Sequence, residues 1–170
     1  NFQGGVISLA SCKHHMRIFL DPSDWPTTWI AGFTSVEPVG KNALFCLFRV
    51  SEAFESHRAF WQSDAVDDDV KTAKAAHLDR FGDVYEPRRL EGNPYIPSNY
   101  LGPCKRHVHC EPGDWKEDIR YASNKGRKPS LLLGEVGNTY IWSSPSVFWS
   151  DNIGRGQGKS NMNEFLQKLQ

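Results

Sequence analysis

The run "ALFCLFRVSEAF" at residues 43–54 constrains the fold more than any other stretch of the chain. Its first half is almost continuously apolar, rich in Phe and Leu, and contains neither Gly nor Pro. A short apolar run bounded by turn residues is typical of a strand that is buried on both faces. We therefore predict a central strand over residues 43–54, buried on both sides.

Three further stretches have the composition of strands. "GGVISLAS" (4–11) predicts a short strand, and "PTTWIAGF" (26–33) predicts another, bounded by Pro and Gly. The connection "TSVEPVGKN" carries the Pro, Gly and Asn of a hairpin loop, which would join this strand to the central one. "PSLLLGEVGNTYIWSS" (129–144) predicts a β-hairpin that turns at Gly137-Asn138.

Helical patterns follow the central strand and close the chain. "EAFESHRAFWQS" (52–63) has aromatic residues at helical spacing, and residues 64–81 place acids early and bases late, as a surface helix does. The closing "SNMNEFLQKLQ" predicts a short helix with Ser160 or Asn161 as its N-cap. Residues 82–129 are dense in Pro, Gly and Asn and predict a long loop of the functional or disordered kind. We expect a single mixed α/β domain over residues 1–170.

Charge and composition exclude several classes of protein. The 20 Lys and Arg residues balance the 20 Asp and Glu residues, which argues against a general nucleic-acid coat and favours a small ligand, one nucleotide or a short local contact. The sequence contains no run of about 18 apolar residues, so it predicts no membrane span. No signal peptide is visible, and four cysteines in 170 residues do not indicate a disulfide scaffold, so we expect a cytoplasmic protein.

The segment "CKHHMR" (12–17) gathers reactive and charged groups directly after a predicted strand. Cys12 with His14 or His15 would suit zinc. Lys13 and Arg17 would instead suit a phosphate or carboxylate, since a guanidinium binds such groups in bidentate fashion. A solvated turn above one buried Cys is the plainer interpretation. The residue types alone leave all three open.

Two other segments contain possible ligand-binding residues. "CKRHVHC" holds Cys104, His107, His109 and Cys110, but structural zinc sites usually draw two separated pairs of ligands, so we assign no metal here and leave the site open. "IGRGQGKSN" (153–161) lacks the first Gly of a phosphate-binding P-loop, because Ile153 stands in its place. An anion-binding turn with Arg155 and Lys159, or a flexible glycine loop, remains.

Aromatic and acidic residues supply the remaining candidates. The chain has six tryptophans, and an exposed one stacks a base with a gain of roughly 1–3 kcal/mol. In "SVFWSDN", Phe148 and Trp149 stand beside Asp151 and Asn152, whose side chains suit the edge of a base. "RFGDVYEP" offers Asp83 for acid–base work, although a turn role is the simpler interpretation of an Asp after Gly82.

The order of these segments resembles the nucleotide modification associated domain family, type two. "SLASCKHHMR" matches that family's "TLA-small-CK-x-x-IR" turn at Leu9, Ala10, Cys12, Lys13 and Arg17. Its "GDW-apolar-apolar-G" strand corresponds to "TTWIAGF", with Thr27-Thr28 in place of Gly-Asp, and its "YAMRVTE…FDEYW" to "CLFRVSEAFESHRAFW". Its "GDNIY" is similar to "GDVYEP", whereas its late "VLIS…F-YFG" is only loosely matched. The family's first strand would precede Asn1.

This resemblance implies a role in the modification of DNA bases, or in their recognition, in phages and bacteria. It also implies a bent, PUA-like β-barrel or sheet flanked by helices, like the EVE and ASCH domains that hold a nucleobase in a pocket. The ligand-binding residues carried over are Cys12, Lys13, Arg17, Trp29 and Tyr85. Lys13 and Arg17 would face a phosphate or base acceptor with Cys12 packed beneath, while Trp29 or Tyr85 would stack on the base.

The partner we therefore expect is a nucleobase, a nucleotide or modified DNA, without a membrane and without a cofactor. The alternative is an enzyme, a hydrolase or group transferase, that acts on modified nucleotides. Lys13 would then be the base or charge stabiliser and Asp83 its acid–base partner. The shared fold does not separate the binder from the enzyme.

Overall fold

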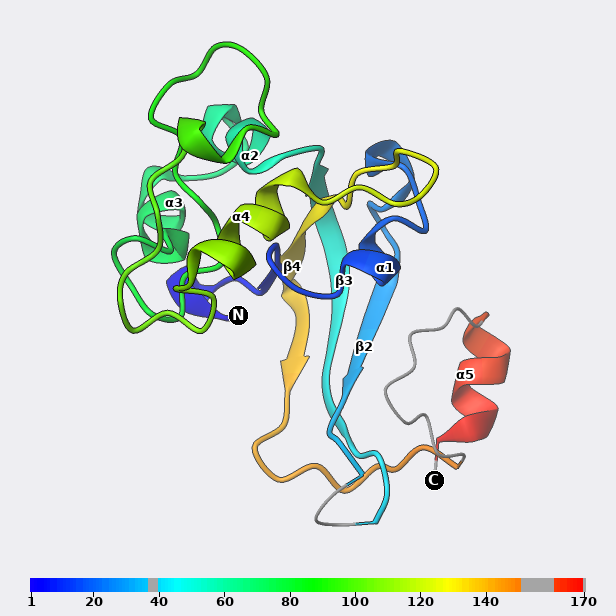
Figure 1. Ribbon diagram of the computed structural model, residues 1–170. Coiled ribbons are helices and arrows are strands. Elements are labelled where there is room, and N and C mark those ends of the chain that lie inside the picture. Colours follow the sequence, from blue (N-terminus) through cyan, green and yellow to red (C-terminus); the bar gives the residue numbers. More distant parts are fainter. Residues whose placement is uncertain (37–39, 151–160, 170) are drawn as a thin grey trace.

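The computed structural model describes residues 1–36, 40–150 and 161–169. Their framework is an open, curled sheet of four antiparallel strands in the order β1-β4-β3-β2 (Figure 1). The strands are β1 (Ser8–Leu9), β2 (Trp29–Phe33), β3 (Leu44–Phe54) and β4 (Leu131–Ile141). The mixed α/β fold with a bent sheet flanked by helices is therefore confirmed, in the form of a half-barrel that stays open.

The central position of β3 follows from its sequence. It pairs with β2 from Trp29 opposite Arg49 to Phe33 opposite Leu44, which confirms the hairpin between these two strands. Burial along β3 alternates, however: Leu44, Cys46, Phe48 and Val50 are buried, whereas Phe45 is 40% exposed. The prediction of burial on both faces was wrong, because the helices cover only part of this curled sheet.

The predicted hairpin at residues 129–144 is one continuous strand. β4 pairs with β3 both before and after residues 135–138, so the chain does not turn back into a separate hairpin at Gly137-Asn138. Phe48 lies opposite Thr139 and Val50 opposite Gly134, so one residue of β3 faces four residues of β4. Gly137 and Asn138 lie within this bulge and not in a hairpin turn, because the apolar residues on both sides of the bulge pair with the same neighbouring strand.

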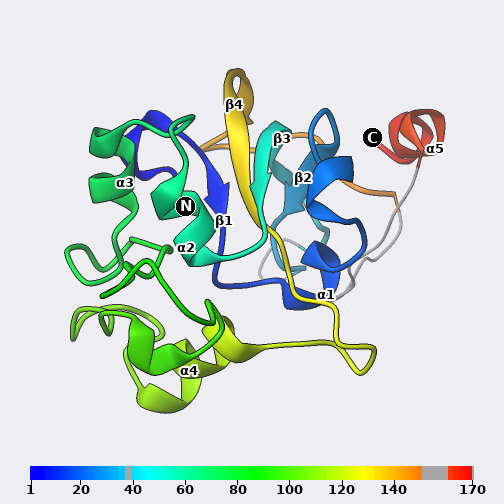
Figure 2. The same cartoon turned by 90° about the horizontal axis from the view of Figure 1, so that it is seen from above.

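The described helices lie at the two sides of the sheet. They are α1 (His14–Arg17), α2 (His57–Gln62), α3 (Asp68–Lys74), α4 (Pro112–Arg120) and α5 (Met162–Lys168). α2, α3 and α4 gather beside β1 and β4, and α5 lies beyond β2 (Figure 2). Asn161 caps α5 in a capping box with Glu164, which confirms the predicted closing helix. Within the described ranges, no helix is long and apolar enough to cross a membrane.

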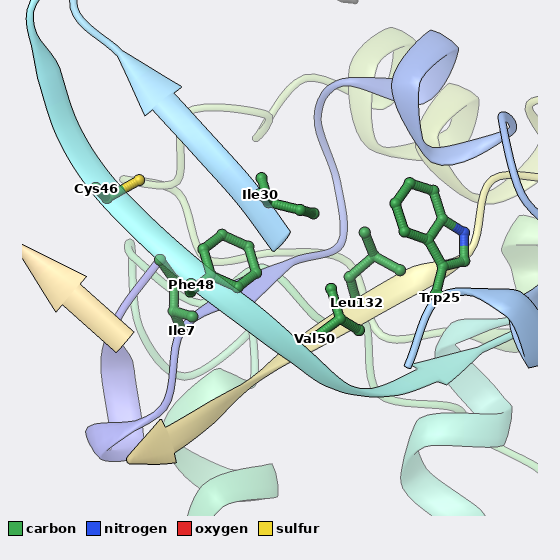
Figure 3. Packing of buried hydrophobic residues seen from close by; sticks show 7 residues of the cluster. All are labelled: Ile7, Trp25, Ile30, Cys46, Phe48, Val50 and Leu132. Atoms are coloured by element: carbon green, nitrogen blue, oxygen red, sulfur yellow. The ribbon is translucent and has the colours of Figure 1, made fainter. Parts of the chain in front are cut away.

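Three apolar clusters hold these elements together. The first lies on the sheet and consists of Ile7, Trp25, Ile30, Cys46, Phe48, Val50 and Leu132 (Figure 3). A second packs α2 against the sheet through Phe54, Phe60 and Leu131. A third packs α4 through Ile119 against Tyr85 and Tyr100. This last cluster fixes the face of α4 that carries Asp118 toward the rest of the protein.

The stretch from residue 82 to 129 is irregular, as predicted, except for a 3-10 turn at Pro97–Asn99 and for α4, which the sequence analysis missed. α4 has sequence signals of its own: Pro112 at its start, Asp114 in its first turn and Arg120 in its last. α3 is shorter than predicted, because the chain turns after Lys74 and Ala75 forms a parallel bridge with Val84.

Candidate functional site

A buried arginine lies at the centre of the candidate site. Lys13 has a left-handed conformation (φ 58°) and starts the short helix α1, whose last residue, Arg17, is only 1% exposed. Arg17 Nε donates to the Cys12 carbonyl at 2.7 Å and Nη1 to the Ser130 carbonyl at 2.8 Å. Nη2 is buried and has no hydrogen-bond partner among the described residues. Burial lowers the pKa of Arg17 to about 10, so the guanidinium stays charged at neutral pH.

Asp118 brings three separate segments together. Its carboxylate accepts from Tyr85 Oη at 2.7 Å and from His109 Nδ1 at 2.6 Å, and His14 Nε2 lies 3.2 Å from its other oxygen. The His14 ring is in turn stacked on Tyr121, with 4.5 Å between the ring centroids. Burial alone would raise the pKa of Asp118, but these surrounding donors lower it below its ordinary value. The carboxylate is therefore ionised at neutral pH.

His57 presents a neutral imidazole beside these two charges. Its Nδ1 accepts from the Tyr85 backbone N–H at 3.2 Å. Burial, and to a smaller degree the charge of Arg17, lowers the pKa of His57 to about 3. Since a neutral imidazole carries one proton and Nδ1 is an acceptor, the proton resides on Nε2, which is left as a donor.

A narrow cleft runs between these groups. Arg17, His57 and Asp118 line it together with Tyr95 and with the apolar side chains of Ile119, Pro129 and Leu131. Its cavity of about 20 Å³ has room for roughly one water molecule. Glu55 and Ser56 line it as well, so the cleft offers a charged donor, a neutral donor and two acidic acceptors beside apolar side chains.

Of the three matched residues at the start of the chain, Cys12 and Lys13 do not line this cleft. The Cys12 carbonyl accepts from Arg17, and burial raises the pKa of the Cys12 thiol, although the residue as a whole is exposed. The thiol interacts electrostatically with Arg17, so the expectation that Cys12 packs beside the cations stays a prediction. Lys13 is exposed as well, and its side chain makes no hydrogen bond or ion pair within the described ranges. Of the three matched residues at the start of the chain, only Arg17 reaches the cleft.

The two predicted stacking residues are placed differently from expectation. Tyr85 is 0% exposed, so its ring offers no face to a ligand, and its contribution is the hydrogen bond that holds Asp118. Trp29 does not line the cleft. It lies on β2 in a row of nearly parallel rings, 6.5 Å from Tyr140, which is itself 6.3 Å from Trp142.

The predicted acid–base pair of Lys13 and Asp83 makes no contact in the described structure. Asp83 is buried, and both of its carboxylate oxygens lie within 2.9 Å of Ser8 Oγ, which donates to them. This contact joins β1 to the segment that carries Tyr85. Asp83 therefore helps to position Tyr85 rather than lining the cleft.

The possible zinc ligands are engaged in other contacts. His107 Nε2 lies 2.6 Å from the Gly82 carbonyl, and His107 Nδ1 accepts from the His109 N–H. Cys104 and Cys110 are partly buried free thiols. The segments "CKHHMR" (12–17) and "CKRHVHC" (104–110) lie close together, because His14 and His109 both contact Asp118. Even so, no group of three or more His, Cys, Asp or Glu in the described ranges is placed to hold a metal ion.

The glycine loop at residues 153–161 falls almost wholly outside the described residues, as do Asp151 and Asn152 of the other candidate segment. The sequence analysis missed Asp118 and the role of His57, and it considered His109 only as a zinc ligand. The signal for Asp118 was available, because Trp115, Asp118 and Ile119 share one face of the helix that Pro112 begins.

The chain was compared with protein-family models, with curated proteins and with solved structures, and none of these comparisons gives a match. The resemblance to the nucleotide modification associated family therefore stays a prediction that depends on the sequence motifs alone.

Proposed function

We propose that this protein binds a modified nucleobase or nucleotide, and that the cleft lined by Arg17, His57 and Asp118 receives the modified group. The observation that carries the proposal is the buried Arg17 with an unpartnered Nη2 at a cleft. A buried charged group without a full set of partners is costly, so a site that keeps one is suited to a ligand that completes it. The motif resemblance supports the same ligand class.

The size of the cleft favours one part of such a ligand. A cavity of about 20 Å³ is too small for a heterocycle, but it accommodates an oxygen-bearing substituent attached to one. Arg17 Nη2 and His57 Nε2 would donate to that substituent, while Asp118 would accept from a hydroxyl. A hydroxymethyl group on a base meets this description, whereas an unmodified base leaves both donors without a partner.

A titration of the wild-type protein tests this proposal. We expect a hydroxymethylated pyrimidine nucleoside to bind at least about tenfold more tightly than the plain nucleoside, because two buried donors gain partners only with the former. Isothermal titration calorimetry measures both affinities. Equal or absent binding across the panel would refute the proposal without recourse to any variant.

Variants then locate the binding site. Arg17→Lys removes Nη2 while keeping the charge, and we expect it to abolish the preference for the modified nucleoside. Lys13→Ala is the matched control, because it removes a cation of the same motif that lies outside the cleft. It also shows whether the exposed ammonium contributes to binding. Far-ultraviolet circular dichroism of each variant checks that the fold is intact. A preference that survives in Arg17→Lys would place the ligand elsewhere.

The enzyme alternative rests on one pair of residues. The Asp118 carboxylate accepts a hydrogen bond from His109 Nδ1 at 2.6 Å, which leaves His109 Nε2 as a proton acceptor. The His109 side chain is 29% exposed. An imidazole oriented by a carboxylate in this way is the usual form of a general base. We expect any turnover of a modified nucleotide to fall by about 10²-fold or more in His109→Ala while binding persists. Loss of turnover in Asp83→Asn alone, with His109→Ala active, would return the role to the pair Lys13 and Asp83.

A further inference from the structure

An open hollow with a basic lining lies on the two segments that lead to Asp118. It has a volume of about 390 Å³ and is lined by Leu78, Asp79, Arg80, Cys104, Lys105 and Arg106. Three cations against one carboxylate give the hollow a net charge of +2, in a chain whose formal net charge is zero. The hollow is therefore locally basic although the whole chain is neutral.

The backbone of the hollow is fixed by hydrogen bonds between its two turns. Cys104 N donates to the Ala76 carbonyl at 2.9 Å, which joins the segment of Lys105 to the segment of Arg80. Ala76 N in turn donates to the Val84 carbonyl at 2.9 Å. At Gly82, any Cβ would come within 2.5 Å of the Ala75 backbone, so these turns pack closely. The cations consequently extend from a preformed support and not from a free loop.

The hollow is connected along both segments to residues that hold Asp118, which lines the proposed binding cleft. Arg106 precedes His109 by three residues, and Arg80 precedes Tyr85 by five; both His109 and Tyr85 bind Asp118. Three residues of extended chain span at most about 11 Å, which bounds the separation of Arg106 and His109 along the backbone. A strand of nucleic acid bridges such a distance with a few nucleotides.

We propose that this hollow binds the phosphodiester backbone of a single-stranded nucleic acid in which one base presents its modifying group to the cleft. This inference rests on the proposed function and names its substrate class: a base within a strand, not a free nucleoside. Arg80 and Arg106 pair with phosphate oxygens through two donors each, and Lys105 adds a point charge. A single strand is favoured because its bases turn freely toward the protein, whereas a base in a duplex must first be unstacked.

Short oligonucleotides test the inference. The probes are a modified nucleoside, a single-stranded trinucleotide with the same base in its centre, a stable longer duplex that contains this trinucleotide, inorganic phosphate and a phosphoserine peptide. We expect the trinucleotide to bind at least about tenfold more tightly than the nucleoside at low salt, and its log K to fall with log salt at a slope of about −0.7 per phosphate contacted. The duplex and the peptide are expected to bind more weakly than the trinucleotide.

The double variant Lys105→Ala/Arg106→Ala, compared with the control Lys116→Ala/Lys125→Ala, locates the contact. Both remove two exposed cations, so non-specific attraction changes equally. We expect only the first to lose the tenfold gain and to flatten the salt dependence, with nucleoside affinity unchanged. Equal affinities for trinucleotide and nucleoside, equal behaviour of the two double variants, or displacement by the peptide or by phosphate at equal concentration would overturn the inference. If the proposed function is wrong instead, the trinucleotide will bind equally well whether its central base is modified or plain.

Discussion

At the scale of single residues, the site depends on side chains that make two contacts at once. Tyr85 is not one of the proposed ligand-binding groups. Its backbone N–H nevertheless sets the tautomer of His57, and its hydroxyl donates to Asp118. Burial and the neighbouring Asp118 carboxylate raise the pKa of Tyr85, so the hydroxyl keeps its proton and remains a donor. One residue therefore positions both His57 and Asp118 at the cleft.

Tyr85→Phe removes the hydroxyl and keeps the ring. We expect a loss of about 1.5–3 kcal/mol in the free energy of unfolding, because a buried hydrogen bond to a charged acceptor is lost. Urea denaturation followed by Trp fluorescence measures it. Tyr121→Phe is the control, since Tyr121 stacks on His14 through its ring and its hydroxyl makes no hydrogen bond in the described ranges. Similar losses in the two variants would contradict the role given to Tyr85.

The matched residues illustrate what the motif could and could not reveal. Arg17 was a candidate from the sequence, but its side chain turns inward, to the carbonyls of Cys12 and Ser130, and Ser130 is 113 residues away along the chain. Cys12 and Lys13 belong to the same motif but do not line the cleft. The residue types are the same in either arrangement, so only the path of the turn decides which of them reaches the cleft.

At the scale of elements, the bulge in β4 explains how one strand serves two parts of the protein. Residues before the bulge are buried against β1 and β3. Val136 within the bulge, and Tyr140 and Ile141 beyond it, are exposed. Gly134 stands at the beginning of the bulge and is in close contact with Ile7 and Phe48. The absence of a side chain there lets β1 and β3 close over β4.

Gly134→Ala tests this packing. The new Cβ would overlap Ile7 Cγ2 and lie 2.9 Å from Phe48 Cδ2, so we expect a destabilisation of about 1–3 kcal/mol. Gly137→Ala is the matched control, because nothing lies within 4 Å of its Cβ, and we expect a change within about 0.5 kcal/mol. Thermal and urea denaturation of both variants provide the comparison. A larger effect at Gly137 than at Gly134 would mean that β4 does not have this register.

At the scale of the whole molecule, the cleft exists only in the complete fold. Its polar walls come from α1, the start of α2 and α4, which are held together by Tyr85 and Asp118. Burying a neutral histidine in such an assembly makes stability depend on pH. The pKa of His57 is about 3 in the fold against 6.5 in the unfolded chain, so protonation favours unfolding.

The stability that neutral His57 contributes is therefore fully present above pH 6.5 and is lost as the pH falls toward 3. We expect His57→Gln to reduce the decline in unfolding free energy between pH 6.5 and 4.5, by up to about 1.4 kcal/mol per pH unit. The amide oxygen of Gln can still accept from the Tyr85 N–H. Urea denaturation at several pH values measures the difference between the variant and the wild type. The other histidines are common to both proteins, so identical slopes would show that His57 is not buried in the neutral form.

Several local elements were predictable from the linear pattern of residues: β3 from its apolar run, the β2–β3 hairpin from its connecting residues and α5 from its cap. These depend on propensities and on contacts between near neighbours, which a linear pattern records. The tertiary structure alone decided that Gly137-Asn138 forms a bulge, that Arg17 is buried, and that Asp118 gathers His14, Tyr85 and His109. Those outcomes depend on which distant segments exclude water from one another, and that is a property of packing in three dimensions.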